Sequence, residues 1–291
     1  MSSSQSLLEP VSDAHAVAAL EARSAQRRRR ADWASWVDRA VLLGLTAAGL
    51  LSADGPAPFY AALGLAFGGL AGGVLGGAAL VTLLGERSGR RLQGPRRGSA
   101  RRLAGARDTA IAMWVAAALL AWPLARVLVG KPIGLVWTVP DVGTALRLSA
   151  QTVASLFVLD AWLYWKHRLL HTRWLFPLHR AHHAYRDPNG FSSFAVGPVE
   201  ALATFWPIVL LAVPEATHWA PLYFPLVVAF IALNLYLHCG VSVRALEAIL
   251  PKLLLNTSVF HNRHHANAAA SFSEAFTVWD RICRTREQDR R

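Results

Sequence analysis

The sequence predicts an all-α, integral-membrane helical bundle with a histidine-rich di-metal site on its cytoplasmic side. Three observations lead to this prediction. Hydrophobic residues make up 54% of the chain and charged residues only 16%, whereas a soluble domain carries about 25% charged residues. Apolar segments of helical length follow one another along the chain, and eight of the eleven histidines fall in three short windows. The low charge content indicates that lipid surrounds much of the protein.

Six apolar segments are the candidate helices of the bundle. They are Trp36–Leu51, Phe59–Leu84, Thr109–Val129, Leu148–Trp165, Ala201–Val213 and Leu222–Leu237. A helix that spans a bilayer needs about 20 apolar residues. The second and third segments meet this length, whereas the first, fifth and sixth are marginal. We expect the last two to form either a re-entrant hairpin or a pair of tilted helices.

The sequence predicts three parts. Residues 1–34 form a polar and basic tail, residues 35–147 hold the N-terminal transmembrane helices with a basic loop at 86–108, and residues 148–291 contain the histidine windows. The tail has no clear cleavage site after its charged part. We therefore expect an uncleaved membrane anchor, since a removed signal peptide carries such a site.

Positive charge is concentrated beside the apolar segments. The net charge is +12, and arginines cluster in Arg23–Arg30 and Arg87–Arg107. Basic residues that flank apolar segments are typical of the cytoplasmic side of a membrane protein. This distribution favours membrane contact and argues against nucleic-acid binding. If the N-terminus is cytoplasmic, alternate crossings bring all three histidine windows back to the cytoplasmic side.

Glycines recur every four residues in the second apolar segment, at Gly64, Gly68, Gly72 and Gly76. Small residues at this spacing let two helices approach closely in lipid. Two interpretations remain open: a contact between the two chains of a homodimer, and a tightly packed helix pair within one chain. The second interpretation is favoured.

The histidine windows have the spacing of metal ligands. They are His167–His171, His179–His183 and His261–His265, and within them histidines are separated by one, three or four positions. Residues three and four apart share one face of a helix, about 5–6 Å apart. Clustered imidazoles suit iron, zinc, copper or nickel, and they do not suit magnesium or calcium. The windows therefore predict a metal site.

The number of histidines exceeds the needs of one ion. A single structural zinc ion takes four ligands in a closed tetrahedron, so eight histidines fit two adjacent ions with open positions. His238 ends the sixth apolar segment and is predicted to be a further ligand. Asn234 lies four residues earlier on the same face, where it would contact a ligand or a water, or else form a hydrogen bond inside the bundle.

Asp160 is a carboxylate within an otherwise apolar segment. A charge in the centre of a bilayer costs about 2.5–3.5 kcal/mol on insertion scales, so it needs a partner. Asp160 lies two helical turns before His167, and it would orient a ligand by accepting a histidine N–H. A pair with Lys166 or Arg168 is the alternative, and the sequence does not separate the two.

The order of these motifs resembles the fatty acid hydroxylase/sterol desaturase superfamily of integral-membrane, non-heme di-iron oxygenases. The resemblance runs from about Asp160 to Thr285, and it includes the three windows, the hairpin between them and the Trp279-Asp280-Arg281 triplet. One histidine window would be weak evidence, but three in this order with the hairpin are specific.

The chain departs from the family pattern at three places. The family commonly has His-Pro where this chain has Gly197-Pro198, and the segments Ser271–Glu274 and Ile282–Thr285 also differ from it. None of these changes removes a predicted metal ligand. They bear on the substrate more than on the chemistry.

The resemblance implies an O2-dependent oxidoreductase of lipid metabolism in which residues 148–291 are the catalytic domain. A monooxygenase that hydroxylates its lipid is favoured over a desaturase. The implied cofactor is a pair of iron ions, and no catalytic residue is expected beyond the metal ligands. The implied ligands are His167, His171, His179, His182, His183, His238, His261, His264 and His265.

The implied reaction needs two electrons from another protein, because the chain has no flavin, heme or Rossmann motif. A ferredoxin, a cytochrome b5-like protein or a reductase is the expected partner. Two other classes of protein remain alternatives: a membrane metal transporter, and a metal-binding but catalytically inactive lipid-binding protein. A sterol, a fatty acyl chain, a sphingolipid, a carotenoid and an ether lipid all remain open as the lipid.

Overall fold

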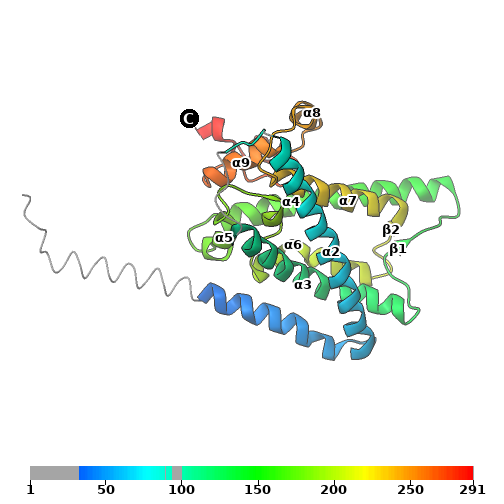
Figure 1. Ribbon diagram of the computed structural model, residues 1–291. Helices are drawn as coiled ribbons and strands as arrows, with labels where there is room; N and C mark the ends of the chain where they lie inside the picture. The colour runs from blue at the N-terminus through cyan, green and yellow to red at the C-terminus, as the bar shows by residue number, and fades with distance from the viewer. Residues whose placement is uncertain (1–32, 89, 94–99, 291) are drawn as a thin grey trace, which may run out of the picture.

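The computed structural model describes residues 33–88, 90–93 and 100–290, and these residues form an all-α bundle, as predicted (Figure 1). The predicted tail at 1–34 lies outside the described residues apart from its last two positions. The longer helices are Trp33–Leu51, α2 (Pro56–Ser88), α3 (Ala100–Leu128), α4 (Val142–Leu170) and α7 (Ala220–Leu237). The shorter α-helices are α5 (Phe176–His183), α6 (Pro198–Phe205), α8 (Arg244–Ile249), α9 (Ser258–Ala266) and α10 (Val278–Ile282).

Short 3-10 helices and one small sheet complete the described chain. The 3-10 helices are η1 (Gly49–Leu51), η2 (Gly190–Ser192), η3 (Trp206–Ala212), η4 (Leu250–Leu253) and η5 (Glu287–Arg290). The sheet consists of two parallel strands, β1 (Leu135–Val136) and β2 (His218–Trp219), in which Leu135 pairs with His218. This pairing ties the α3–α4 connection to the turn before α7.

In the part of the chain that the structure describes, five helices are long and apolar enough to cross a membrane: Trp33–Leu51, Pro56–Gly85, Arg101–Leu128, Val142–Leu170 and Ala220–Leu237. The predicted segment at Ala201–Val213 is different, because it divides into α6 and η3. Pro207 has no N–H to donate to the Ala203 carbonyl, so the α-helix cannot continue through it. The Trp162 indole donates to that carbonyl instead, at 2.7 Å.

The connections alternate between two ends of the bundle. At one end, Lys131 Nζ lies 2.6 Å from Asp54 Oδ1 and β1 pairs with β2. At the other end, Arg91 pairs with Val241 in a β-bridge, and Ala34 packs against Leu170 and Leu178. The histidine windows therefore lie at the same end as the start of the first helix and the basic connection after α2, which is the arrangement that counting crossings predicts.

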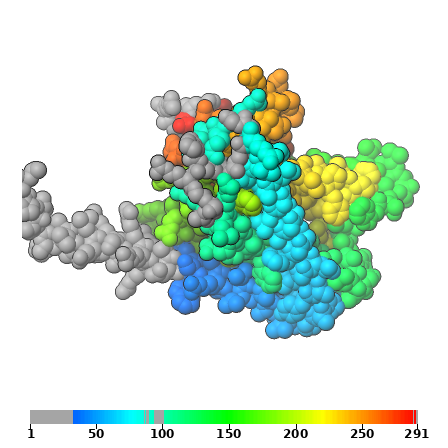
Figure 2. Space-filling view, viewed as in Figure 1, coloured from blue at the N-terminus to red at the C-terminus, as the bar shows by residue number. Residues whose placement is uncertain are grey.

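The four glycines at four-residue spacing in α2 do not contact another helix within the described part of the chain. The contact of α2 with α3 is made by other residues, among them Phe59, Ala62 and Ala66. A Cβ atom added at Gly64, Gly68, Gly72 or Gly76 would meet no atom within 4 Å. Figure 2 shows α2, in cyan, running along the outer face of the molecule. The favoured interpretation, in which these glycines form the contact of a helix pair within one chain, is therefore wrong. The α2–α3 pair is made by the alanine-rich face of α2 instead.

Candidate metal centre

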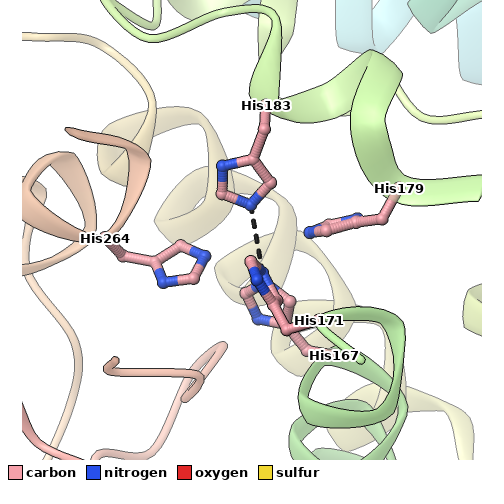
Figure 3. A group of neighbouring side chains, drawn as sticks. All are labelled: His167, His171, His179, His183 and His264. Atoms are coloured by element: carbon pink, nitrogen blue, oxygen red, sulfur yellow. Dashed lines mark hydrogen bonds between the residues drawn. The ribbon is translucent and has the colours of Figure 1, made fainter. Parts of the chain in front are cut away.

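Nine histidines converge in two neighbouring groups. The five-histidine group comprises His167, His171, His179, His183 and His264, and the four-histidine group comprises His182, His238, His261 and His265. Within each group, one nitrogen from every histidine lies within 4.8 Å of all the others. Figure 3 shows the rings of the five-histidine group directed toward a common centre from three segments of the chain. All nine residues that the sequence predicted as ligands are thus brought together.

Four elements position these rings. The last turn of α4 carries the first window, α5 carries the second, α9 carries the third, and His238 directly follows α7. Consecutive residues of a helix are rotated by about 100°, so the neighbours His182 and His183 enter different groups, as do His264 and His265. Each doublet therefore contributes to both groups. The spacing of the histidines predicts that they share one face of a helix, and it does not predict this division between two groups.

The distances between ring nitrogens match those of ligands on one ion. Nε2 of His171 lies 3.2 Å from that of His167 and 3.1 Å from that of His183. In the other group, Nε2 of His261 lies 3.0 Å from that of His238 and 3.2 Å from that of His265. Nitrogens about 2.0–2.1 Å from one ion would be separated by about 2.9 Å at right angles and about 3.3 Å in a tetrahedron.

The opposite ring nitrogens fix the tautomer of several histidines. Nδ1 donates to the Phe272 carbonyl from His167 at 2.9 Å, and to the Ala270 carbonyl from His264 at 2.8 Å. Nδ1 of His238 donates to the Asn234 carbonyl at 2.9 Å. A neutral imidazole that carries its proton on Nδ1 has a lone pair on Nε2. Converging lone pairs repel one another unless a cation lies between them, so this donor set fits a metal ion.

Burial keeps the imidazoles in the metal-binding form. It lowers the pKa of His171 to about 3, that of His183 to about 2 and that of His238 to about 4. The pKa values of His261 and His265 also lie well below the ordinary value, again through burial and then through neighbouring histidines. These rings are neutral near pH 7, and neutral imidazole is the form that binds metal.

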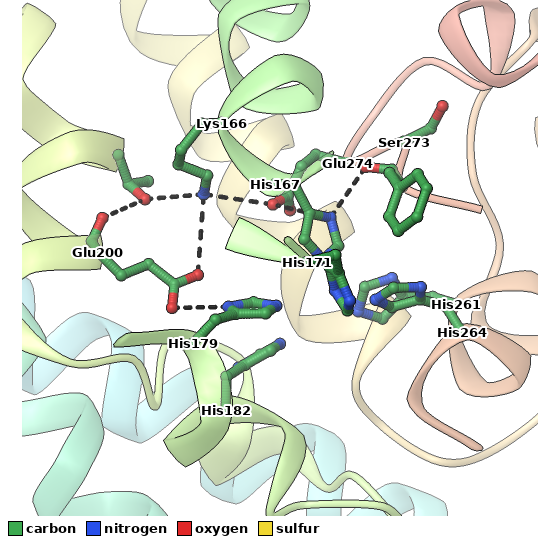
Figure 4. A network of polar contacts seen from close by, with 12 residues as sticks. Lys166, His167, His171, His179, His182, Glu200, His261, His264, Ser273 and Glu274 are labelled. Atoms are coloured by element: carbon green, nitrogen blue, oxygen red, sulfur yellow. Dashed lines mark hydrogen bonds and ion pairs between the residues drawn. The ribbon is translucent and has the colours of Figure 1, made fainter. Parts of the chain in front are cut away.

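A buried network of charges lies beside the five-histidine group. Glu200 Oε2 accepts from Nδ1 of His179 at 2.8 Å. Lys166 Nζ lies 3.9 Å from Glu200 and 3.4 Å from Glu274, and it donates to Thr204 Oγ1 at 3.0 Å. Figure 4 shows Lys166 between the two carboxylates. A carboxylate that holds the distal N–H of a ligand fixes the ring and strengthens its basicity.

Glu200 and Glu274 were not predicted as site residues from the sequence, and Lys166 was predicted only as a possible partner of Asp160. The signal that drew attention to Asp160 also applies to Glu200, which is a carboxylate at the start of an apolar segment. The carbonyls of Ala270 and Phe272 carry no sequence signal, because any residue supplies a carbonyl and only the path of the loop aims it.

Asp160 contacts neither a histidine nor a basic residue among the described residues. Its carboxylate accepts from the backbone N–H groups of Ala275 and Phe276 and from the Trp279 indole at 2.7 Å. It therefore binds the C-terminal segment to α4, and that segment carries the Phe272 carbonyl which holds His167. Both predictions for Asp160, a histidine contact and a pair with Lys166 or Arg168, named partners close to it in the sequence. Its hydrogen-bond partners come from a distant segment instead.

Gly197 lies where the family commonly has a histidine. The Asp38 carboxylate occupies this space: a Cβ atom at Gly197 would lie 2.9 Å from Asp38 Oδ2. Asp38 also accepts the Val199 N–H at 3.0 Å. The first helix thus holds the start of α6, and a larger residue at position 197 would displace it.

A narrow cavity of about 30 Å³ adjoins the four-histidine group. His182 and His238 form part of its wall, together with the apolar side chains of Leu163, Phe194 and Phe230. A hydrocarbon in this cavity would contact apolar side chains and the two histidines at the same time.

Comparison with known proteins agrees with this geometry. Residues 152–285 match the fatty acid hydroxylase family. The chain is 30% identical to lathosterol oxidase of Homo sapiens over 142 residues, which cover 47% of this chain and 44% of that protein. It is 29% identical to methylsterol monooxygenase 2-2 of Arabidopsis thaliana over 150 residues, which cover 50% of this chain and 55% of the relative.

A Delta(7)-sterol 5(6)-desaturase of Gibberella zeae is 30% identical over 132 residues, which cover 44% of this chain and 35% of that protein. The chain thus spans about half the length of the curated relatives it matches, or less. No solved structure matches.

Proposed function

Because residues 152–285 belong to the fatty acid hydroxylase/sterol desaturase superfamily, we propose that this protein is a membrane-bound, non-heme di-iron monooxygenase that oxidises a lipid. The observation that carries the proposal is the pair of adjacent imidazole groups, one of five and one of four rings. A pair of iron ions bound there would activate O2 for the oxidation of an unactivated C–H bond. Hydroxylation is proposed ahead of desaturation.

The chain's own residues hold and orient this centre. The five-histidine group would bind one ion and the four-histidine group the other. Glu200 and the Ala270, Phe272 and Asn234 carbonyls fix the ring orientations, so little rearrangement accompanies metal binding. The apolar side of the adjoining cavity would receive the hydrocarbon and exclude water.

The overall reaction requires an electron donor. Hydroxylation converts a C–H bond, O2, two electrons and two protons into a C–OH bond and one water. We propose that a ferredoxin, a cytochrome b5-like protein or a reductase supplies the electrons on the cytoplasmic side, where the histidines are proposed to lie. The basic connection after α2 reaches the same end of the bundle as the histidines, and complementary charge would speed docking of an acidic partner.

The relatives favour a sterol or a related lipid as the substrate, since the names of the three compared relatives refer to sterols. Residues 148–291 are proposed as the catalytic domain and 35–147 as helices that anchor it. The outward glycines of α2 leave a homodimer contact as a further proposal.

A metal transporter is the competing function. Transport needs ligands distributed along the depth of the membrane, whereas all nine histidines lie in two adjoining groups at one end of the bundle. A catalytically inactive lipid-binding protein would not need to retain two complete sets of ligands. The geometry therefore favours the oxygenase.

Metal content per chain tests the proposal directly. Protein expressed with added iron should contain about two iron ions per chain, and the His182→Ala/His264→Ala variant, which loses one ring from each group, should contain fewer. Lipids extracted from expressing cells should then show a mass increase of one oxygen that is absent with the variant. One metal or none in folded wild-type protein would contradict the di-iron centre, and metal flux in vesicles without O2 consumption would favour transport.

A further inference from the structure

The two histidine groups differ in how the protein holds their rings. In the five-histidine group, three rings donate from Nδ1 to a backbone carbonyl or to the Glu200 carboxylate. In the four-histidine group, Nδ1 of His182, His261 and His265 is buried and has no hydrogen-bond partner among the described residues. His238 donates to a carbonyl of its own helix. The positions of the other three rings therefore depend on the backbone segments that carry them.

The 90–93 segment, which follows α2, is hydrogen-bonded to the chain directly after α7. Its Leu92 N–H donates to the Gly240 carbonyl at 3.0 Å. In return, the Ser242 N–H donates to the Arg90 carbonyl, also at 3.0 Å. Gly240 lies only two residues after the predicted ligand that follows α7. The segment therefore fixes the backbone from which one ring of the four-histidine group extends.

Two side chains of the 90–93 segment extend to the other backbone segments of this group. Gln93 Nε2 donates to the Arg186 carbonyl at 2.8 Å and to Asn262 Oδ1 at 3.0 Å. Arg186 follows α5, and Asn262 lies in α9 next to a predicted ligand. Arg91 Nη2 lies 2.9 Å from Asp187 Oδ2, and these side chains are only 18% and 20% exposed. A partly buried ion pair is screened less by solvent than a surface pair, so it restrains the segment more firmly.

Close packing of α2 holds the start of the 90–93 segment in place. A Cβ atom at Gly85, in the last turn of α2, would lie 2.8 Å from Val241 Cγ2. The lack of a side chain at this glycine lets α2 approach the residues that follow α7. Val81, one turn earlier on α2, packs against the buried cluster that includes Cys239 and Val241. The movement of the segment is therefore restricted, and it can restrain the backbone that it contacts.

We propose, on the basis of the di-metal function proposed above, that the 90–93 segment positions the four-histidine group and that Gln93 is its main positioning residue. Gln93 joins the second histidine window to the third, and the backbone of the segment adds the chain after His238. The five-histidine group depends less on this segment, because hydrogen bonds to its own rings orient it. The segment lies outside residues 152–285, which match the family, so the N-terminal half completes one of the two metal sites.

Zinc binding by full-length, metal-free protein in detergent tests this role, since zinc has no redox chemistry of its own. Wild-type protein should bind two zinc ions in competition with a chelator of known affinity. Gln93→Ala should keep one ion at wild-type affinity and bind the other about tenfold more weakly, as expected when a supporting contact is lost. Gln93→Lys keeps a donor of similar reach and should keep most of the affinity.

Gln151→Ala is the matched control. It also removes a bond from a glutamine Nε2 to a backbone carbonyl, that of Thr217 at 2.9 Å, but at the opposite end of the bundle. This variant should bind both ions as the wild type does. Equal weakening of both ions by Gln93→Ala would indicate general destabilisation and would overturn the proposal.

Alkylation of Cys239 in metal-free protein measures the same positioning without any metal. Cys239 directly precedes Gly240 and is 5% exposed. Gln93→Ala should raise its rate of reaction with iodoacetamide about fivefold, which corresponds to the loss of one hydrogen bond. Cys283, which is half-buried, is the internal reference and should react at the same rate in both proteins. Equal rates for Cys239 in both proteins would overturn the proposal.

Failure of the proposed function gives a different result. Wild-type protein that binds fewer than two ions would overturn the di-metal centre, and the alkylation of Cys239 would still test the contacts of the 90–93 segment. Two bound ions, with no effect of Gln93→Ala on the second ion or on Cys239, would overturn only the positioning role.

Discussion

At the scale of single residues, a histidine ring is oriented by the hydrogen bond that its other nitrogen makes, on the side facing away from the centre of its group. His167, His238 and His264 donate to backbone carbonyls, whereas His179 donates to the Glu200 carboxylate. Carbonyls cannot be altered by substitution, but the carboxylate can. Glu200 is therefore the position at which ring orientation is open to experiment.

Replacement of Glu200 should weaken metal binding in a graded way. Glu200→Ala leaves Nδ1 of His179 without its acceptor, and loss of such a partner typically lowers metal affinity by about 10–100-fold. Glu200→Gln keeps an oxygen acceptor and should lose less. Iron retained against a competing chelator measures the effect, with the exposed Glu215→Gln as the control. Equal retention by Glu200→Ala and wild type would show that the contact does not support the ligand.

Two adjacent histidines should differ in their effect on metal content. His264→Ala leaves four rings in its group, whereas His265→Ala leaves three. Because four ligands complete a tetrahedral set and three do not, His265→Ala should lose more metal. Metal per chain after exhaustive dialysis measures this order, with His218→Ala, outside both groups, as the control. The reverse order would contradict the division of the doublets.

At the scale of elements, the C-terminal segment is held against α4 by one buried carboxylate. Asp160 accepts from Ala275, Phe276 and Trp279, and the same segment supplies the carbonyls that orient His167 and His264. The proposed metal centre therefore depends on a residue that contacts none of the nine histidines.

Asp160→Asn should loosen this segment. The amide nitrogen of asparagine cannot accept these N–H groups, and each hydrogen bond to a charged acceptor contributes about 1.5–3 kcal/mol. We expect a lower midpoint of thermal unfolding and faster proteolytic cleavage between Ala266 and Val278. Asp289→Asn, an exposed position, is the control. Unchanged cleavage would mean that other contacts suffice to hold the segment.

The elements that could be predicted from sequence are those whose signal is local. The long apolar helices and the histidine windows follow from composition and spacing. The division of Ala201–Val213 into α6 and η3 depends on Pro207 and on a tryptophan from α4. The outward direction of the α2 glycines depends on which face α3 covers. Contacts between distant segments, such as that of Asp160 with Trp279 and that of Gly197 with Asp38, leave no pattern in the neighbouring sequence from which they could be predicted.

At the scale of the whole molecule, many neutral imidazoles buried together make stability depend on pH. The pKa of His238 is lowered from 6.5 to about 4 by burial. Between these pH values the unfolded chain binds a proton that the folded chain does not. The contribution to stability is therefore full above pH 6.5 and is lost as the pH falls toward 4, by about 3 kcal/mol for this residue alone.

Metal-free protein in detergent should accordingly show a falling midpoint of thermal unfolding as the pH is lowered through this range. Metal-loaded protein should fall less at first, because bound metal competes with protons for the rings. A midpoint that stays constant or rises as the pH falls would contradict the burial of neutral histidines.

The distribution of the two groups along the chain also determines the order of assembly during synthesis. His167, His171, His179 and His183 are made first, and together they already offer four imidazoles, whereas the four-histidine group gains three of its members only with His238, His261 and His265. Four nitrogens suit zinc, and copper binds such ligands more tightly than iron. The nascent chain is thus exposed to capture of the wrong metal before α7 enters the membrane and α9 closes the site. Loading of the proposed iron centre would therefore depend on the metals available in the cell during translation.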